Sequence, residues 1–199
     1  FWFMPNPVDG GIETGRVDEV PRADLPYDGI FLGTDIGTRR QQLDHLRRSL
    51  PSDYRFHTGG RRVGNERMNG VAFLAALRQA AVCPQLPLDD SGAPATPRLT
   101  TSARIAQTLG QGVLALTPAS GRFEEIYEDG VVPFASRDEL ADHMTALARN
   151  DERRRRIAGT GRRLAHDRMN GTRVAKYIVE VAMEEPLSEA YGWPSDPIV

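Results

Sequence analysis

The chain has 199 residues, of which 40% are hydrophobic and 26% charged, and its formal net charge is −2 at pH 7. A chain of this length can bury a core, as one large domain or two small ones, without disulfides or structural metals. The composition excludes disordered, collagen-like and coiled-coil chains. The small net charge gives no positive field that would attract nucleic acid or an anionic membrane, so we expect neither as a partner.

Several functional classes lack the residues that they need. The one cysteine, Cys83, lies in an apolar run, which excludes a disulfide framework and a cysteine-based metal site. We expect Cys83 to be a small core residue, and a lone thiol fits a reducing, cytoplasmic location. The sequence holds no phosphate-binding loop of NTPases, no hydrolase nucleophile elbow and no Asp-x-Asp pair for a divalent ion. No stretch is long and apolar enough for a transmembrane segment, and no signal peptide is visible.

Short apolar runs alternate with amphipathic stretches along most of the chain. Residues 1–28 are punctuated by proline and glycine, and we interpret them as a connector that leads into a domain over residues 29–185. Residues 186–199, with three prolines, form a tail. Apolar runs predict strands at 29–33, 54–57, 81–88, 113–117 and 131–134. Apolar stripes predict helices at 39–50, 71–80, 102–109 and 122–127, and further helices that begin near 136, 151 and 170.

Strands that alternate with helices of this length predict a parallel sheet with right-handed crossovers. The expected fold class is therefore α/β, a Rossmann-like parallel sheet flanked by helices. In such sheets ligands bind outside the carboxyl ends of the strands. This directs attention to residues 33–40 and 59–62, to the approach to Ser102, and to residues 117–125.

Local signals add two expectations about the later helices. Ser136 and Glu139 have the spacing of a capping box, in which a hydroxyl and a carboxylate satisfy backbone amides at a helix start. The stretch 151–173 is strongly basic, and we interpret it as a solvated helix face because no aromatic residues are interleaved with its arginines. A surface that binds phosphate or nucleic acid is the alternative interpretation.

The order of several degenerate motifs carries a resemblance to a known family. The segments TSARIAQTLGQG (101–112) and GRFEEIYEDG (121–130) are followed by SRDEL (136–140) and IAGTGR (157–162). Together they resemble the C-terminal, donor-binding domain of two-domain GT-B glycosyltransferases, within the bacterial group that is similar to spore-maturation glycosyltransferases. The resemblance covers most of residues 1–185. It implies that the chain is the C-terminal half of a GT-B fold, with an N-terminal acceptor domain expected upstream.

The resemblance implies transfer of a sugar from a nucleotide-diphosphate sugar to an acceptor. Negative charge grows on the diphosphate as the glycosidic bond breaks, so the site needs fixed positive charge, helix N-termini or a metal ion. Because the Asp-x-Asp motif is absent, we expect metal-independent chemistry, no cofactor, and arginine in place of the metal. Arg104 matches the family's arginine and is the first candidate for the diphosphate. The alternative is an arginine on a solvated helix face.

The remaining candidate donor-binding residues are Gly33, Thr34, Arg39, Ser102, Gln107 and Glu124. Gln107 departs from the family, which usually has a glutamate for the ribose hydroxyls at this position. An amide accepts hydrogen bonds without charge, so donor binding is weaker or differs in geometry. Ser102 either bonds a phosphate or caps its helix, and capping is favoured. Glu124 either touches the donor or is a first-turn glutamate that the helix dipole stabilises, and the latter is favoured.

Two other functions stay open at this point. A non-catalytic nucleotide-binding or interaction module could use the same fold, and the departure at Gln107 supports it. A dinucleotide oxidoreductase is less favoured because no G-x-G-x-x-G follows the first strand. We assign no catalytic residue, and we expect the isolated chain to bind donor weakly and to turn over little or nothing.

Overall fold

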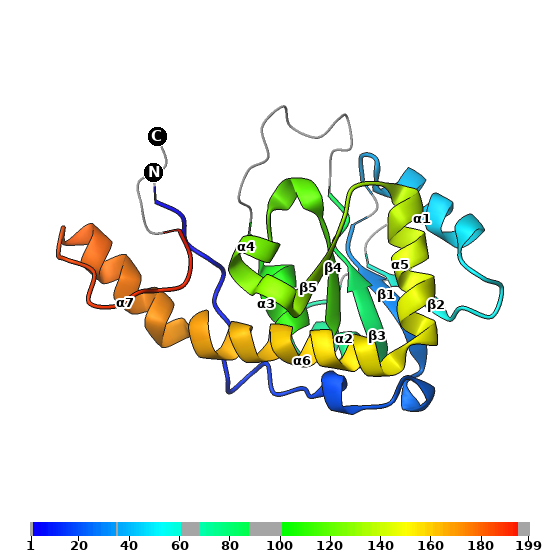
Figure 1. The fold of residues 1–199 in the computed structure, drawn as a ribbon, viewed down its shortest axis with the longest axis horizontal. Helices are drawn as coiled ribbons and strands as arrows, with labels where there is room; N and C mark the ends of the chain where they lie inside the picture. The colour runs from blue at the N-terminus through cyan, green and yellow to red at the C-terminus, as the bar shows by residue number, and fades with distance from the viewer. Residues whose placement is uncertain (1, 35, 61–67, 88–100, 195–199) are drawn as a thin grey trace.

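The computed structural model describes residues 2–34, 36–60, 68–87 and 101–194. Its centre is a sheet with the strand order β2-β1-β3-β4-β5, in which all neighbouring strands are parallel (Figure 1). The strands are β1 (Tyr27–Leu32), β2 (Phe56–Gly59), β3 (Ala80–Pro84), β4 (Leu114–Pro118) and β5 (Val131–Phe134). This sheet confirms the predicted Rossmann-like α/β class.

Among the described residues, seven α-helices and several short 3-10 turns connect and cover the strands. The first four helices are α1 (Arg39–Ser49), α2 (Gly70–Leu77), α3 (Ala103–Gly110) and α4 (Glu124–Tyr127). The last three are α5 (Arg137–Arg149), α6 (Asp151–Arg168) and α7 (Gly171–Ala182). The 3-10 turns are η1 (Val17–Glu19), η2 (Arg22–Asp24), η3 (Ala119–Gly121) and η4 (Glu128–Gly130).

The strand order creates a switch point at β1. The chain leaves β1 toward β2 on one side, whereas β3 and the later strands lie on the other side. Because each crossover is right-handed, α1 and α2 lie on opposite faces of the sheet. In agreement, α1 contacts α5, whereas α2 contacts β1 and β3. A crevice therefore opens beyond the carboxyl ends of β1 and β3, where the crossovers diverge.

The predicted elements exist, with shifted boundaries that have local causes. Strand β2 begins at Phe56 rather than 54 because a turn, closed by the Tyr54 amide on the Pro51 carbonyl, occupies the preceding residues. Strand β3 ends at Pro84, since proline has no amide hydrogen for the ladder. Helix α4 is shorter than predicted because Arg122 takes a left-handed conformation just before it. Val71, predicted on the buried stripe of α2, is 84% exposed.

The core lies on both faces of the sheet. One cluster packs β1 and β3 against α1, α2 and α5, and Cys83 is buried within it, as predicted. A second cluster joins α3, α4 and β5 to α7 and to the later part of α6. The predicted capping box at α5 also forms: the Ser136 hydroxyl accepts the Glu139 amide at 3.1 Å, and the Glu139 carboxylate accepts the Ala135 amide at 2.6 Å.

The interpretation of the basic stretch as a solvated face is wrong for part of α6. Arg154 is completely buried, and it donates to the Val17 and Val20 carbonyls at 3.2 and 2.6 Å. Arg155 and Arg162 also bind this N-terminal segment, which runs beside α6 (Figure 1). These arginines therefore attach the beginning of the chain to its longest helix.

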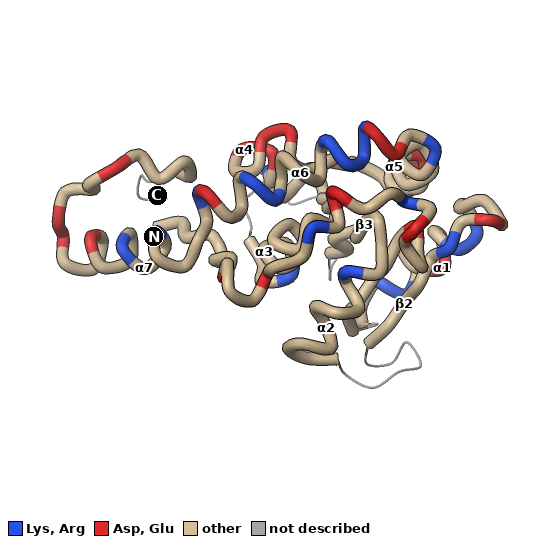
Figure 2. The backbone as a smooth tube through the Cα atoms, turned by 90° about the horizontal axis from the view of Figure 1, so that it is seen from below, with Lys and Arg blue, Asp and Glu red and all other residues tan. Residues whose placement is uncertain are grey.

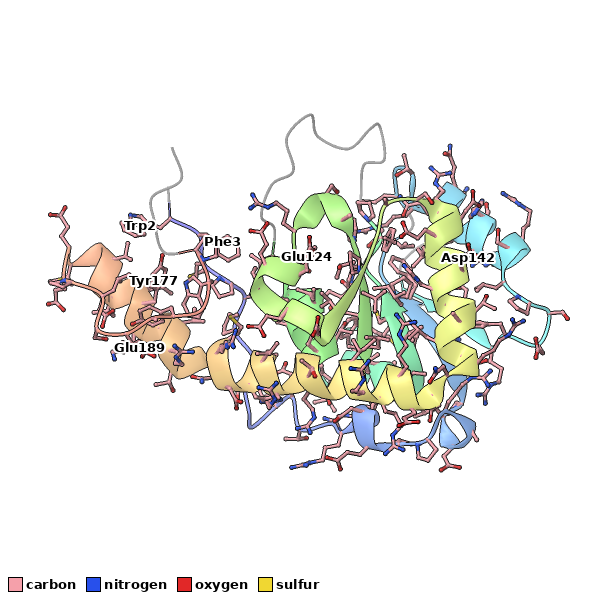
Figure 3. All side chains as sticks on the ribbon, in the orientation of Figure 1. Trp2, Phe3, Glu124, Asp142, Tyr177 and Glu189 are labelled. Carbon is pink, nitrogen blue, oxygen red and sulfur yellow. The ribbon has the colours of Figure 1, made fainter. Side chains whose placement is uncertain are left out.

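The two ends of the described chain meet at α7. Trp2 packs edge-to-face on Tyr177, with ring centroids 6.4 Å apart (Figure 3). The rings of Tyr191 and Trp193 are buried against the same tyrosine, so residues 186–194 fold back onto the domain. That residues 1–28 connect to a further domain stays a prediction. None of the helices among the described residues has the length and apolar character required to cross a bilayer.

Candidate functional site

A hollow of about 440 Å³ opens at the switch point of the sheet. Its walls come from the ends of β1 and β2 and from the first turns of α1, α2 and α3. The lining residues are Leu32, Gly33, Thr34, Arg39, Gly60, Met68, Asn69, Gly70, Phe73, Ala103, Arg104 and Gln107. Because the carboxyl ends of parallel strands meet here, this is the position where open α/β sheets bind ligands. We call this hollow the switch-point pocket.

Two glycines bring the loops after β1 and β2 together at one side of the pocket. The Gly33 amide donates to the Gly59 carbonyl at 2.9 Å. Gly60 has a φ of +115°, and a Cβ there would lie 2.4 Å from the Gly33 oxygen. A side chain at Gly60 would force the two loops apart, and a Cβ on Gly33 would lie 2.9 Å from the Phe31 ring. The close approach therefore depends on the absence of side chains.

Two arginines that line the pocket project from different helices over one buried aromatic ring. Arg39 begins α1, Arg104 lies in the first turn of α3, and their Cζ atoms are 5.8 and 5.2 Å from the centroid of Phe31. Cations at this distance are attracted to the face of a ring. The Phe31 side chain, buried at the end of β1, thus holds both guanidinium groups near the pocket.

Arg39 is also fixed by backbone carbonyls. Its Nε donates to the Leu86 oxygen at 3.1 Å, and its Nη1 lies 3.4 Å from the Thr34 oxygen. These bonds join the end of β1 to the segment after β3, across the switch point. By contrast, the half-buried Arg104 guanidinium has no hydrogen-bond acceptor among the described residues. Backbone carbonyls thus hold Arg39, whereas no described residue accepts a hydrogen bond from the Arg104 side chain.

The described lining of the pocket is positively charged. It holds two arginines and no aspartate or glutamate, so no carboxylate among the described lining residues neutralises the two guanidinium groups. Burial and, to a lesser degree, the nearby charge of Arg104 lower the pKa of Arg39 to about 10. Arg39 therefore remains charged at neutral pH. A pocket lined by two close arginines is complementary to an anion.

The start of α3 contributes to the same side of the pocket. Ser102 caps the helix: its hydroxyl accepts the Ile105 amide at 3.3 Å, as predicted. Arg104 follows two residues later, and Gln107 lies about one turn further along the helix, so both side chains share a face. The helix N-terminus adds partial positive charge to that of the arginines.

The structure brings together five of the seven predicted site residues. Gly33, Thr34, Arg39, Arg104 and Gln107 all line the switch-point pocket. The other two have different positions. Ser102 acts as the α3 cap and is not among the lining residues.

Glu124 is the second predicted residue outside the lining. It lies in the first turn of α4, after β4 (Figure 3). Its Oε2 atom is buried and has no hydrogen-bond partner among the described residues, whereas the neighbouring Glu125 pairs with Arg122. A contact of Glu124 with a donor stays a prediction.

One wall of the pocket was not assigned residue by residue from the sequence. Met68, Asn69, Gly70 and Phe73 line it from the start of α2. Residues 59–62, after the second predicted strand, were expected at this end of the sheet. No local sequence pattern indicates which helix begins beside them. Residues 61 and 62, also in the region of interest, lie outside the described residues.

No cluster of three or more His, Cys, Asp or Glu side chains that could hold a metal ion occurs within residues that the structure describes. The fold and this pocket define a class: an α/β domain with an arginine-lined hollow at the switch point of a parallel sheet. Residues 39–180 match the family described as glycosyl transferase-like, and the chain belongs to this family. A comparison with curated proteins found no match.

Solved structures of glycosyltransferases share the fold. An α1,3-fucosyltransferase aligns with a TM-score of 0.57 and 11% identity, over 95% of this chain and 55% of that chain. WaaG, a glycosyltransferase involved in lipopolysaccharide biosynthesis, aligns with a TM-score of 0.59 and 13% identity, over 89% of this chain and 55% of that chain. The C-terminal domain of LpcC, a group 1 glycosyl transferase from Francisella tularensis, aligns with a TM-score of 0.55 and 13% identity, over 82% of this chain and 99% of that chain. The chain thus spans about half of the first two and has the fold of a GT-B C-terminal domain.

Proposed function

We propose that this chain is the donor-binding part of a glycosyltransferase and that the switch-point pocket holds a nucleotide-diphosphate sugar. The observation that carries the proposal is the pair Arg39 and Arg104, held over Phe31 in a pocket whose described lining has no carboxylate. Membership in the glycosyl transferase-like family supports sugar transfer in general. A diphosphate is the part of such a donor that two converging guanidinium groups fit best.

The same two residues provide the chemistry that the leaving group requires. As the bond between sugar and diphosphate breaks, negative charge develops on the bridging phosphate oxygen. Fixed cations and the N-terminus of α3 stabilise this charge more strongly than they stabilise the uncleaved donor, which lowers the barrier. Since the positive charge comes from arginine, we propose that transfer requires no divalent ion.

The remaining walls suit the nucleoside. Gln107, one turn after Arg104, can accept or donate hydrogen bonds to ribose hydroxyls through its amide. Met68 and Phe73 offer half-buried apolar surface to a base. A module that binds nucleotide without catalysing transfer is the second candidate, favoured by the neutral Gln107 where the resembled family has a carboxylate.

Calorimetric titration with UDP, GDP and their sugars tests the proposal. We expect at least one nucleotide to bind the parent chain and to bind Arg104→Ala at least about tenfold more weakly, since a charged hydrogen bond is lost. Arg48→Ala is the matched control, because Arg48 is exposed on α1 and does not line the pocket. If no nucleotide binds, or if both variants bind like the parent, the proposal fails.

The acceptor site is proposed to lie outside this chain, in an N-terminal domain. The chain spans only 55% of the fucosyltransferase that shares its fold, so a two-domain enzyme has room for a second half. We expect residues 1–199 alone to release little or no sugar from a radiolabelled donor. Measurable transfer by this chain alone would contradict the division of roles.

A further inference from the structure

Helix α6 has a basic face that is already occupied by an acidic segment. Arg155 donates to the Asp18 and Glu19 carbonyls at 3.0 and 2.9 Å, and Arg162 binds the Asp18 carboxylate at 2.8 Å. Arg154 binds two further carbonyls of the same segment. The segment Val-Asp-Glu-Val, residues 17–20, is thus held by guanidinium groups that contact both its main chain and its acidic side chains.

A second set of arginines lies on another side of the same helix. Arg153, Arg156 and Arg163 are exposed, and they line a hollow of about 640 Å³ between α6, α5 and β5. Their spacing of three and seven residues keeps them on one face of the helix. Within the described part of the chain, none of the three guanidinium groups has a hydrogen-bond or ion-pair partner. Figure 2 shows the basic residues along α6 in blue.

The acidic residues around this hollow neutralise only part of its positive charge. Glu128 pairs with Arg168, outside the lining. Glu139 accepts the Ala135 amide, which leaves its negative charge in place, and Asp129 has no partner among the described residues. Three guanidinium groups thus face two carboxylates, and the hollow keeps one positive charge in excess.

The shape of the hollow indicates which kind of partner it can bind. It runs beside β5, the edge strand of the sheet, whose exposed Pro133 has no amide hydrogen to offer. Proline on an edge strand discourages the addition of another strand, so recognition here would rely on the arginine side chains. A concave site suits a chain segment better than it suits the plane of a membrane surface.

We propose that Arg153, Arg156 and Arg163 form a docking site for an extended acidic segment of a partner protein. The residues are equivalent in chemistry to Arg154, Arg155 and Arg162, which hold such a segment of this chain on the other side of the helix. Guanidinium groups bind carboxylates and carbonyls through paired, directional hydrogen bonds, which gives the site its preference for acidic peptide. The site is separate from the switch-point pocket and does not depend on its function.

Fluorescence anisotropy with a labelled peptide carrying two copies of Val-Asp-Glu-Val tests this site. A peptide with glutamine and asparagine in place of the acids is the neutral control. We expect the acidic peptide to bind, the neutral one not to, and the triple variant R153Q/R156Q/R163Q to lower affinity at least about tenfold. The control variant R47Q/R48Q/R149Q removes the same charge from exposed arginines outside the hollow and is expected to retain affinity within about twofold.

Three results would overturn the proposal. The first is the absence of binding by the parent chain, and the second is an equal loss of affinity in both triple variants, which would indicate general charge attraction. The third is that vesicles with anionic lipid displace the peptide and bind more tightly than it does, since this would identify a membrane surface as the partner. Thermal unfolding of both variants confirms that they remain folded.

Discussion

The guanidinium groups of Arg39 and Arg104 share one aromatic support, with their Cζ atoms 5.8 and 5.2 Å from the centroid of Phe31. They come from the starts of α1 and α3, which are about 65 residues apart in the chain. The two like charges repel each other: the pKa of Arg39 is lowered mainly by burial and in addition by the charge of Arg104. A bound anion offsets this repulsion, so part of the binding free energy of the anion comes from relieving it.

This repulsion leads to a prediction for Arg104→Met. The substitution removes one of the two cations but no side-chain hydrogen bond to a described residue, so we expect the melting temperature to stay the same or to rise. Affinity for a nucleoside diphosphate should fall about 10- to 100-fold, the effect of losing a charged hydrogen bond. Calorimetric titration and thermal unfolding measure the two effects. A lower melting temperature with unchanged affinity would assign Arg104 a structural role instead.

The pH dependence of binding follows from Arg39, whose pKa lies near 10 in the empty pocket. A bound diphosphate favours the charged guanidinium and raises its pKa again. The complex therefore holds a proton that the empty protein loses above this value. Affinity should be constant from about pH 7 to about pH 9 and should fall as the pH rises through about 10.

Arg39→Met is the control for this pH profile, because any titration of the ligand itself is common to both proteins. We expect the variant to bind more weakly at neutral pH and to lose the part of the alkaline decline that belongs to Arg39. Identical profiles for the two proteins, measured by titration at each pH, would exclude Arg39 as the titrating group.

Gly33→Ala should distort the switch-point pocket by displacing the side chains that pack against this position. A Cβ at this position would lie 2.9 Å from the Phe31 ring and 3.2 Å from the Arg104 Nη2 atom. We expect a loss of about 1 to 3 kcal/mol in the free energy of unfolding, as in other overpacked sites, together with weaker diphosphate binding. Gly171→Ala is a matched control, because no atom lies within 4 Å of its Cβ position, and its effect should stay within about 0.5 kcal/mol. Equal free energies of unfolding for Gly33→Ala and Gly171→Ala in urea would contradict the close packing around Gly33.

Arg154→Met should lower the free energy of unfolding more than the substitution of any exposed arginine does. The side chain is fully buried and pairs with Asp151 while it binds two carbonyls of the N-terminal segment. Removing it leaves those acceptors unpaired, which costs about 3 to 5 kcal/mol. The adjacent Arg153→Met changes an exposed residue and should cost less than about 0.5 kcal/mol. The difference is measured by denaturant unfolding, and similar midpoints for both variants would contradict the attachment role of Arg154.

Much of the fold could be predicted from local patterns. The alternation of apolar runs and amphipathic stretches predicted each strand of the parallel sheet, and a hydroxyl at a helix start predicted the caps at Ser102 and Ser136. These features depend on neighbours within a few residues. The positions of Gly33, Arg39 and Arg104 at one end of the sheet followed because parallel strands place their carboxyl ends together.

Contacts between distant segments could not be predicted in this way. Arg154 belongs to a run of four arginines, and nothing local distinguishes the one that binds residues 17 and 20 from its exposed neighbours. Phe31 has the pattern of an ordinary core residue, and its role under two guanidinium groups depends on helices that begin elsewhere in the chain. The wall formed by α2 was missed for the same reason.

Arg39 and Arg104 are proposed to recognise a diphosphate without a metal ion. The most direct test titrates the parent chain with a nucleoside diphosphate, the matching monophosphate and the nucleoside, all in the presence of a chelator. We predict that the diphosphate binds at least about tenfold more tightly than the monophosphate, because only the former engages both guanidinium groups. Equal affinities for the two nucleotides, or binding that appears only when a divalent ion is added, would contradict the claim.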